Sequence, residues 1–152
     1  VIKILNIFFW NNKAYFPVLG KTEIGLFWDT DRLLIADLTV EALTTTMEEI
    51  IRIGNPPIRH PSQEEFRKRT PIQKALKMSS FKKMAQKGVI CCVVYWNPDS
   101  IGVAFSSPNA KDVQEIDYAN EKRYPIDTST ITIVKYILAI VSKRTQNALQ
   151  IG

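Results

Sequence analysis

Hydrophobic residues alternate with other residues along the first quarter of the chain, and a period of two is the pattern of β-strands. Asn11-Asn12 is a turn signal between the first two alternating runs, so these runs are predicted to form a hairpin. Four strands are expected in this region, at Val1 to Trp10, Ala14 to Val18, Thr22 to Trp28 and Arg32 to Ala36. The polar run Asp29-Thr30-Asp31 is expected to be the turn between the last two strands.

The hydrophobic spacing becomes helical from Val40 onward. Thr39 is a suitable N-cap and Gly54 a suitable end, and Asn55-Pro56-Pro57 prevents the helix from continuing. One face of this predicted helix carries Val40, Leu43, Met47, Ile50 and Ile51.

Capping signals predict three short helices in the middle of the chain. Their starts are Ser62 with Glu65, Thr70-Pro71 with Gln73, and Ser79 or Ser80, with the third helix ending at Gly88. Their buried side is expected to consist of Ile72, Leu76, Phe81 and Met84, and Phe66 is also expected to be buried.

The run from Val89 to Trp96 is hydrophobic on both faces, which predicts a central strand covered on two sides. Asn97-Pro98-Asp99 should turn the chain into a strand from Ile101 to Ser106. A final helix is expected from Asp127 or Thr128, with Lys143 and Arg144 near its C-terminal end. Its buried residues are predicted to be Ile131, Val134, Ile137, Leu138 and Val141.

Together these elements predict an α+β fold. A chain of 152 residues, 45% of them hydrophobic, suits one domain covering residues 1–152. We expect a mostly antiparallel sheet of five or six strands, packed with helices and including a long C-terminal helix. The adjacent Cys91 and Cys92 match no redox or zinc motif, and no segment is typical of a membrane span or signal peptide. These features favour a cytoplasmic protein with no membrane partner.

No residue pattern identifies an active site. His60 is the only histidine, which excludes sites that need several imidazoles, and no glycine-rich phosphate loop is present. We therefore assign no catalytic, metal or cofactor-binding residue. Carboxylate pairs for acid–base chemistry remain possible, and the clusters to examine are Asp29 with Asp31, and Asp112 with Glu115 and Asp117. Both clusters are better explained as solvated turns and surface strands. A hydrolase is therefore a weaker hypothesis than a protein that binds a toxin or RNA.

The charge of the chain is distributed unevenly. Residues 59–87 contain nine basic and two acidic residues, a net of +7, while the whole chain carries +5, so the remainder carries −2. The segment from Asp112 to Glu121 is acidic and includes Tyr118. A two-sided charge distribution favours binding to another macromolecule.

The order of features in the middle of the chain resembles the contact-dependent growth inhibition immunity proteins of bacteria. The resemblance covers about Thr39 to Arg144 and has two departures, Met78-Ser79-Ser80 and the acidic segment after Pro108. The matching features are Pro56-Pro57, Pro61, the run Thr70 to Lys77, Ser79-Ser80-Phe81, Lys87-Gly88, the strand from Val89 to Val94, a second strand, Pro108 and a closing helix.

This resemblance implies a protein that binds the C-terminal toxin domain of a contact-delivered effector, often a nuclease, and neutralises it in the cytosol. The matching positions specify turns and packing, so no functional residue is carried over from the family. From charge alone, the candidate partner-binding residues are Asp29, Asp31, Asp112, Glu115, Asp117, Tyr118 and Glu121. Because the whole chain is basic, the other possibility is an acidic toxin that meets the basic stretch Arg67 to Lys87. The alternative is an RNA-binding module that uses the basic helical face of residues 59–87.

Overall fold

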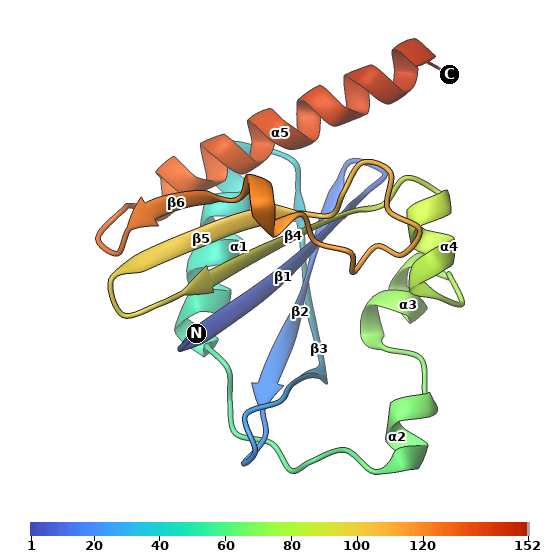
Figure 1. The fold of residues 1–152 in the computed structure, drawn as a ribbon, viewed down its shortest axis with the longest axis vertical. Helices are drawn as coiled ribbons and strands as arrows, with labels where there is room; N and C mark the ends of the chain where they lie inside the picture. Colours follow the sequence, from blue (N-terminus) through green and yellow to red (C-terminus); the bar gives the residue numbers. More distant parts are fainter. Residues whose placement is uncertain (152) are drawn as a thin grey trace.

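The computed structural model describes the backbone of residues 1–151 and the side chains of residues 1–146. Six strands form one sheet in the order β3-β2-β1-β4-β5-β6, and every neighbouring pair is antiparallel (Figure 1). The strands are β1 (Lys3–Trp10), β2 (Lys13–Lys21), β3 (Phe27–Asp37), β4 (Ile90–Trp96), β5 (Ser100–Phe105) and β6 (Lys122–Pro125). This sheet and the helices packed on it confirm the predicted α+β fold.

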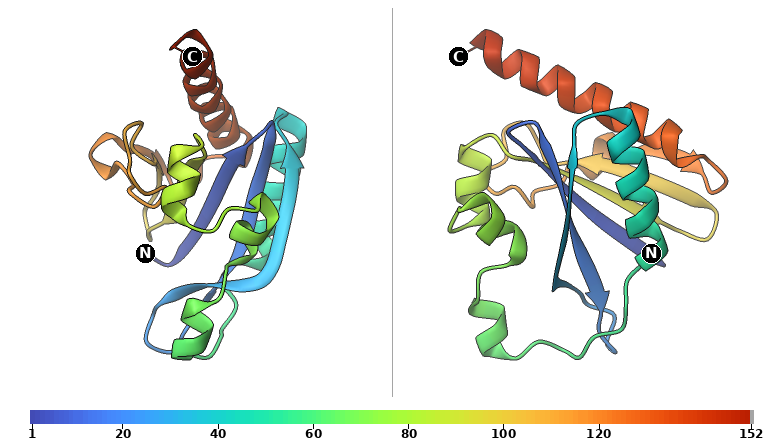
Figure 2. Two further views of the ribbon diagram at one scale, coloured as in Figure 1. Left: turned by 90° about the vertical axis from the view of Figure 1, so that its right-hand side faces the viewer. Right: turned by 180° about the vertical axis from the view of Figure 1, so that it is seen from behind.

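Helices cover both faces of the sheet (Figures 1 and 2). They are α1 (Val40–Ile53), α2 (Gln63–Arg67), α3 (Pro71–Leu76), α4 (Phe81–Gln86), the short 3-10 helix η1 (Tyr118–Asn120) and α5 (Thr130–Ile151). The long helices α1 and α5 pack on one face, and α3, α4 and the segment 107–121 pack on the other. None of the described helices combines the length and the apolar composition that crossing a bilayer requires.

The hydrophobic core has two parts because β4 is buried on both sides. Cys92 and Val94 contribute to the core beneath α1 and α5, while Cys91, Val93 and Tyr95 contribute to the core beneath α3 and α4. This arrangement follows from the alternation of side chains along a strand. The prediction of a central strand covered on two sides is confirmed.

The predicted hairpin turn, helix N-caps and capping boxes are also confirmed. Asn11 and Asn12 have φ angles of 51° and 60°, which two-residue hairpin turns of type I′ require, and asparagine tolerates this conformation. The side chain of Thr39 caps α1, and that of Ser80 caps α4. Both predicted capping boxes form, one at α2 and one at α3.

The prediction of two strands separated by a turn at residues 29–31 is wrong. A single strand, β3, runs through this polar segment, and the turn lies earlier, where the Leu26 amide donates to Thr22 Oγ1. The pairing with β2 is irregular between Pro17 and Leu19, and Thr30 Oγ1 donates to the Val18 carbonyl there. Polar side chains are tolerated because β3 is an edge strand and a hydroxyl replaces part of the backbone ladder.

The final helix also differs from its prediction. It begins at Thr130, after a turn in which the Thr128 amide donates to the Pro125 carbonyl, and it continues to Ile151. Lys143 therefore lies well inside the helix, and Arg144 reaches back to donate to the Ser106 carbonyl at 2.6 Å. Ile131 is 43% exposed because it faces away from the sheet, whereas the other predicted contacts of α5 are buried or partly buried.

Candidate functional site

The acidic segment 112–121 is irregular in backbone but firmly attached to the sheet and to α4. Val113 is fully buried in the core beneath α3 and α4, and its amide donates to the Phe81 carbonyl at 3.2 Å. The Asp117 amide donates to the Phe105 carbonyl at 2.8 Å, and the Ser107 amide donates to the Glu115 carbonyl at 2.9 Å. These contacts order the segment before any partner arrives.

The carboxylates of this segment are held in place by local hydrogen bonds. Asp112 Oδ1 accepts from the Gln114 amide at 2.8 Å, and Asp117 Oδ2 accepts from Asn120 Nδ2 at 2.7 Å. Glu115 Oε2 accepts more weakly from the backbone of residue 111, at 3.4 Å. Each bond uses one oxygen and leaves the other without a hydrogen bond from the described residues. The segment therefore presents oriented negative charge.

Tyr118 and Glu121 differ in how far they are available to a partner. Tyr118 is 52% exposed, and its ring packs edge to face against Tyr95 with 6.2 Å between centroids. Glu121 accepts hydrogen bonds from the Tyr95 hydroxyl and from Arg123 Nε. Burial and the neighbouring Glu121 raise the pKa of Tyr95 to about 12. Glu121 is thus engaged within the chain, and Tyr118 is the exposed aromatic group.

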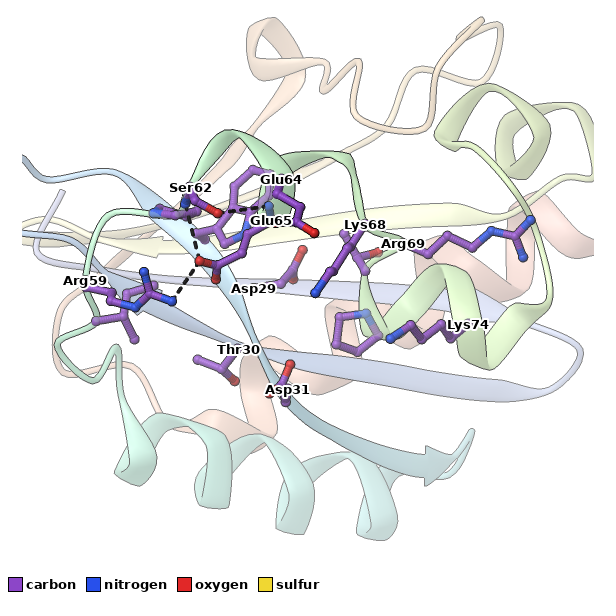
Figure 3. A pocket seen from close by; sticks show the side chains of 15 residues that line it. Asp29, Thr30, Asp31, Arg59, Ser62, Glu64, Glu65, Lys68, Arg69 and Lys74 are labelled. Atoms are coloured by element: carbon purple, nitrogen blue, oxygen red, sulfur yellow. Dashed lines mark hydrogen bonds and ion pairs between the residues drawn. The ribbon is translucent and has the colours of Figure 1, made fainter.

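Asp29 and Asp31 lie at a different place, in a cavity of about 810 Å³ between the start of β3 and residues 58–74. No residue of the acidic segment lines this cavity, so the structure separates the candidate residues into two groups. Figure 3 shows Asp29 and Asp31 on the strand, with Arg59 at one end and Lys68, Arg69 and Lys74 at the other.

The walls of the cavity depend on close packing between segments distant in sequence. Gly20 allows Ile58 to approach β2, because an added Cβ would lie 2.5 Å from Ile58 Cγ2. The Trp28 ring meets Phe66 edge to face at 4.5 Å between centroids, which joins α2 to β3. The prediction that Phe66 is buried is wrong, because α2 buries no residue and Phe66 remains 39% exposed at this contact.

The charges that line the cavity are only partly matched. Arg59 forms an ion pair with Glu65 at 2.8 Å, and Glu65 also completes the capping box of α2. The partly buried carboxylate of Asp29 has no hydrogen bond or ion pair with any described residue. Burial raises its pKa from 3.8 to about 6. A partly buried carboxylate without an ion pair would be stabilised by a cation of a bound ligand or partner.

The basic stretch forms a second charged surface over α2, α3 and α4. Eight of its cations are exposed and form no ion pair within the described part of the chain. They are Arg67, Lys68, Arg69, Lys74, Lys77, Lys82, Lys83 and Lys87. The single His60 is exposed and packs against Phe66. Residues 1–146 contain no group of three or more metal-ligating side chains.

The sequence alone could not reveal the cavity. Asp29 and Lys68 are far apart in the chain, and the contact that closes the cavity joins Trp28 to Phe66. The one available signal was Phe66 itself, a large hydrophobic residue in a short, highly charged helix.

Comparisons with known proteins support the fold only. No family model matches the chain, and no curated protein matches it. A solved structure described as a protein of unknown function, NMB0488 from Neisseria meningitidis, is similar with a TM-score of 0.62. The similarity covers 92% of this chain and 94% of that chain, at 11% sequence identity. The chain therefore shares its α+β fold with this Neisseria protein.

Proposed function

We propose that this chain is an immunity protein that binds and neutralises the C-terminal toxin domain of a contact-dependent growth inhibition effector in the cytosol. The observation that carries the proposal is the ordered acidic segment with exposed Tyr118 and the oriented carboxylates of Asp112, Glu115 and Asp117. Such a surface is complementary to a basic protein, and many nuclease toxins are basic in order to hold phosphate. Because the segment is already ordered, binding costs little conformational entropy.

The positions that carry the family resemblance have structural roles in the fold. Thr70, Pro71 and Gln73 form the start of α3, Ser80 caps α4, and Gly88 has a φ of 87° before β4. These residues specify the scaffold, which leaves the recognition of a particular toxin to exposed side chains.

The proposal is tested by co-expressing the chain with the toxin domain encoded beside it. Restored growth and co-purification of the two proteins are expected. Absence of both would discard the proposal.

The surface is tested with the triple variant Asp112→Asn, Glu115→Gln and Tyr118→Ala. The two amides keep the local hydrogen bonds but remove the charge, so we expect at least a tenfold loss of affinity without unfolding. The matched control, Glu41→Gln with Glu48→Gln, changes exposed charges on α1 and should bind normally. Equal affinity of both variants would place the interface elsewhere.

RNA binding is the second candidate, favoured by the eight exposed cations that form no ion pair within the described residues. Release of counterions from RNA would make the affinity fall steeply with salt, and Lys82→Ala with Lys83→Ala should reduce that slope. A flat salt response would exclude this function.

A further inference from the structure

Asp29 is the one carboxylate of the cavity that is both partly buried and without a partner among the described residues. Glu65 is paired with Arg59, and Asp31 and Glu64 are exposed to solvent. Asp29 sits on a strand whose irregular pairing is fixed by the Thr30 hydroxyl. Its carboxylate therefore has a defined position in the cavity (Figure 3).

An aromatic residue, Trp28, is part of the lining of the cavity. It is held by Phe66 of α2. A carboxylate together with an aromatic ring suits a guanidinium group, which forms paired hydrogen bonds with the former and stacks on the latter. The cavity volume of about 810 Å³ falls within the range of small-ligand sites.

We propose that this cavity binds a guanidinium group, with Asp29 as its counter-ion and Trp28 as its aromatic wall. The cations that line the cavity do not already serve this purpose. Arg59 pairs with Glu65, and none of Lys68, Arg69 and Lys74 forms an ion pair with Asp29. The guanidinium belongs either to an arginine of a bound protein or to a free small molecule. Only the first of these sources rests on the proposed immunity function.

Binding at this site depends on pH through the charge of Asp29. With a pKa of about 6, the carboxyl is almost fully ionised at pH 7.5 and mostly protonated at pH 5, so guanidinium binding should weaken about tenfold. Other charged groups also line the cavity and face the same space. They are Asp31 on β3, Arg59 before α2, Glu64 and Glu65 on α2, Lys68 and Arg69 after it, and Lys74 on α3.

The site is tested on the full chain with ethylguanidinium as the probe and ethylurea as a neutral molecule of the same shape. Nuclear magnetic resonance titration at pH 7.5 should shift the signals of residues 28–31 with ethylguanidinium and not with ethylurea. Asp29→Asn should weaken binding at least tenfold and abolish its pH dependence. Asp99→Asn, an exposed change in the β4–β5 turn, should bind like the parent protein.

The source of the guanidinium is tested with the cognate toxin domain. If a toxin arginine enters the cavity, Asp29→Asn weakens the complex at least tenfold. If the variant loses ethylguanidinium but keeps full toxin affinity, the ligand is a small molecule and the site stands. If the chain binds no toxin, the proposed function fails while the probe result still decides the site. Ethylguanidinium binding that survives Asp29→Asn, or that ethylurea reproduces, overturns the proposal.

Discussion

Asp29 carries a carboxyl group at a position where burial disfavours its charge. The folded protein therefore retains a proton on Asp29 between pH 4 and 6 that the unfolded chain has released, because the pKa rises from 3.8 to about 6. The contribution of Asp29 to the free energy of unfolding falls as pH rises through this window and stays reduced above it. The native protein thus accepts a cost in stability at the proposed site.

We predict that Asp29→Asn stabilises the protein at pH 7.5 by on the order of 1–3 kcal/mol, because a neutral amide avoids the desolvation of a charge. The gain should vanish near pH 4, where the native carboxyl is largely protonated. Urea unfolding at the two pH values measures both effects, with Asp99→Asn as the control. A gain of equal size at both values would show that charge burial is not its cause.

The side chain of Asn55 bridges β1 and β2 through hydrogen bonds to both strands. Its Oδ1 accepts from the Ile4 amide, and its Nδ2 donates to the carbonyls of Ile4 and Leu19, all at 3.0 Å. We predict that Asn55→Ala lowers the free energy of unfolding by about 1–3 kcal/mol, since it leaves part-buried backbone groups unpaired. Asn55→Asp should be at least as harmful because a carboxylate cannot donate. The exposed change Asn109→Ala should have little effect in the same urea titration.

Among the secondary-structure elements, α3 ends in a strained backbone conformation that is confined to one residue. Lys77 follows the helix with a φ of 57° and a ψ of 39°, a left-handed conformation that is unfavourable for side chains other than glycine and asparagine. The Lys77 amide nevertheless donates to carbonyls of the last helical turn, so this conformation closes the helix.

We predict opposite effects for two identical substitutions in this helix. Lys77→Gly should raise the free energy of unfolding by about 0.5–1 kcal/mol, because glycine adopts a positive φ without strain. Lys74→Gly, in the interior of α3, should lower it by about 1 kcal/mol because glycine disfavours helix. Both variants lose one exposed positive charge, so thermal unfolding compares backbone effects alone. Destabilisation by Lys77→Gly would contradict the strained conformation.

At the scale of the whole molecule, the two faces of the sheet are covered by elements of very different length. Cys92 lies beneath α1 and α5, which have 14 and 22 residues, whereas Cys91 lies beneath α3 and α4, which have six residues each. Burial raises the pKa of Cys91 to about 12 and also raises the pKa of Cys92, so neither thiol is reactive in the folded state.

We predict that Cys91 reacts with a thiol reagent several-fold faster than Cys92 under native conditions, because short helices open locally more readily than long ones. The measurement uses two single-cysteine variants, Cys92→Ala to follow Cys91 and Cys91→Ala to follow Cys92. Equal labelling rates would mean that only global unfolding exposes either core.

Features that depend on neighbouring residues could be predicted from the amino-acid sequence. The hairpin turn at Asn11-Asn12, the N-caps at Thr39 and Ser80 and the doubly buried β4 all follow from side chains within a few positions of one another. Such signals are strong because the competing backbone conformations are few and the hydrogen-bond partners are local. They were sufficient to predict the α+β class.

The places where charged residues meet depend on the packing of the folded chain. The polar run at residues 29–31 forms part of β3 because an edge strand can accommodate a bulge, a possibility that local turn propensity does not reveal. The same packing placed Asp29 opposite residues 58–74 and away from the acidic segment. The physical reason is that burial, and with it the pKa of Asp29, is created by segments distant in the chain.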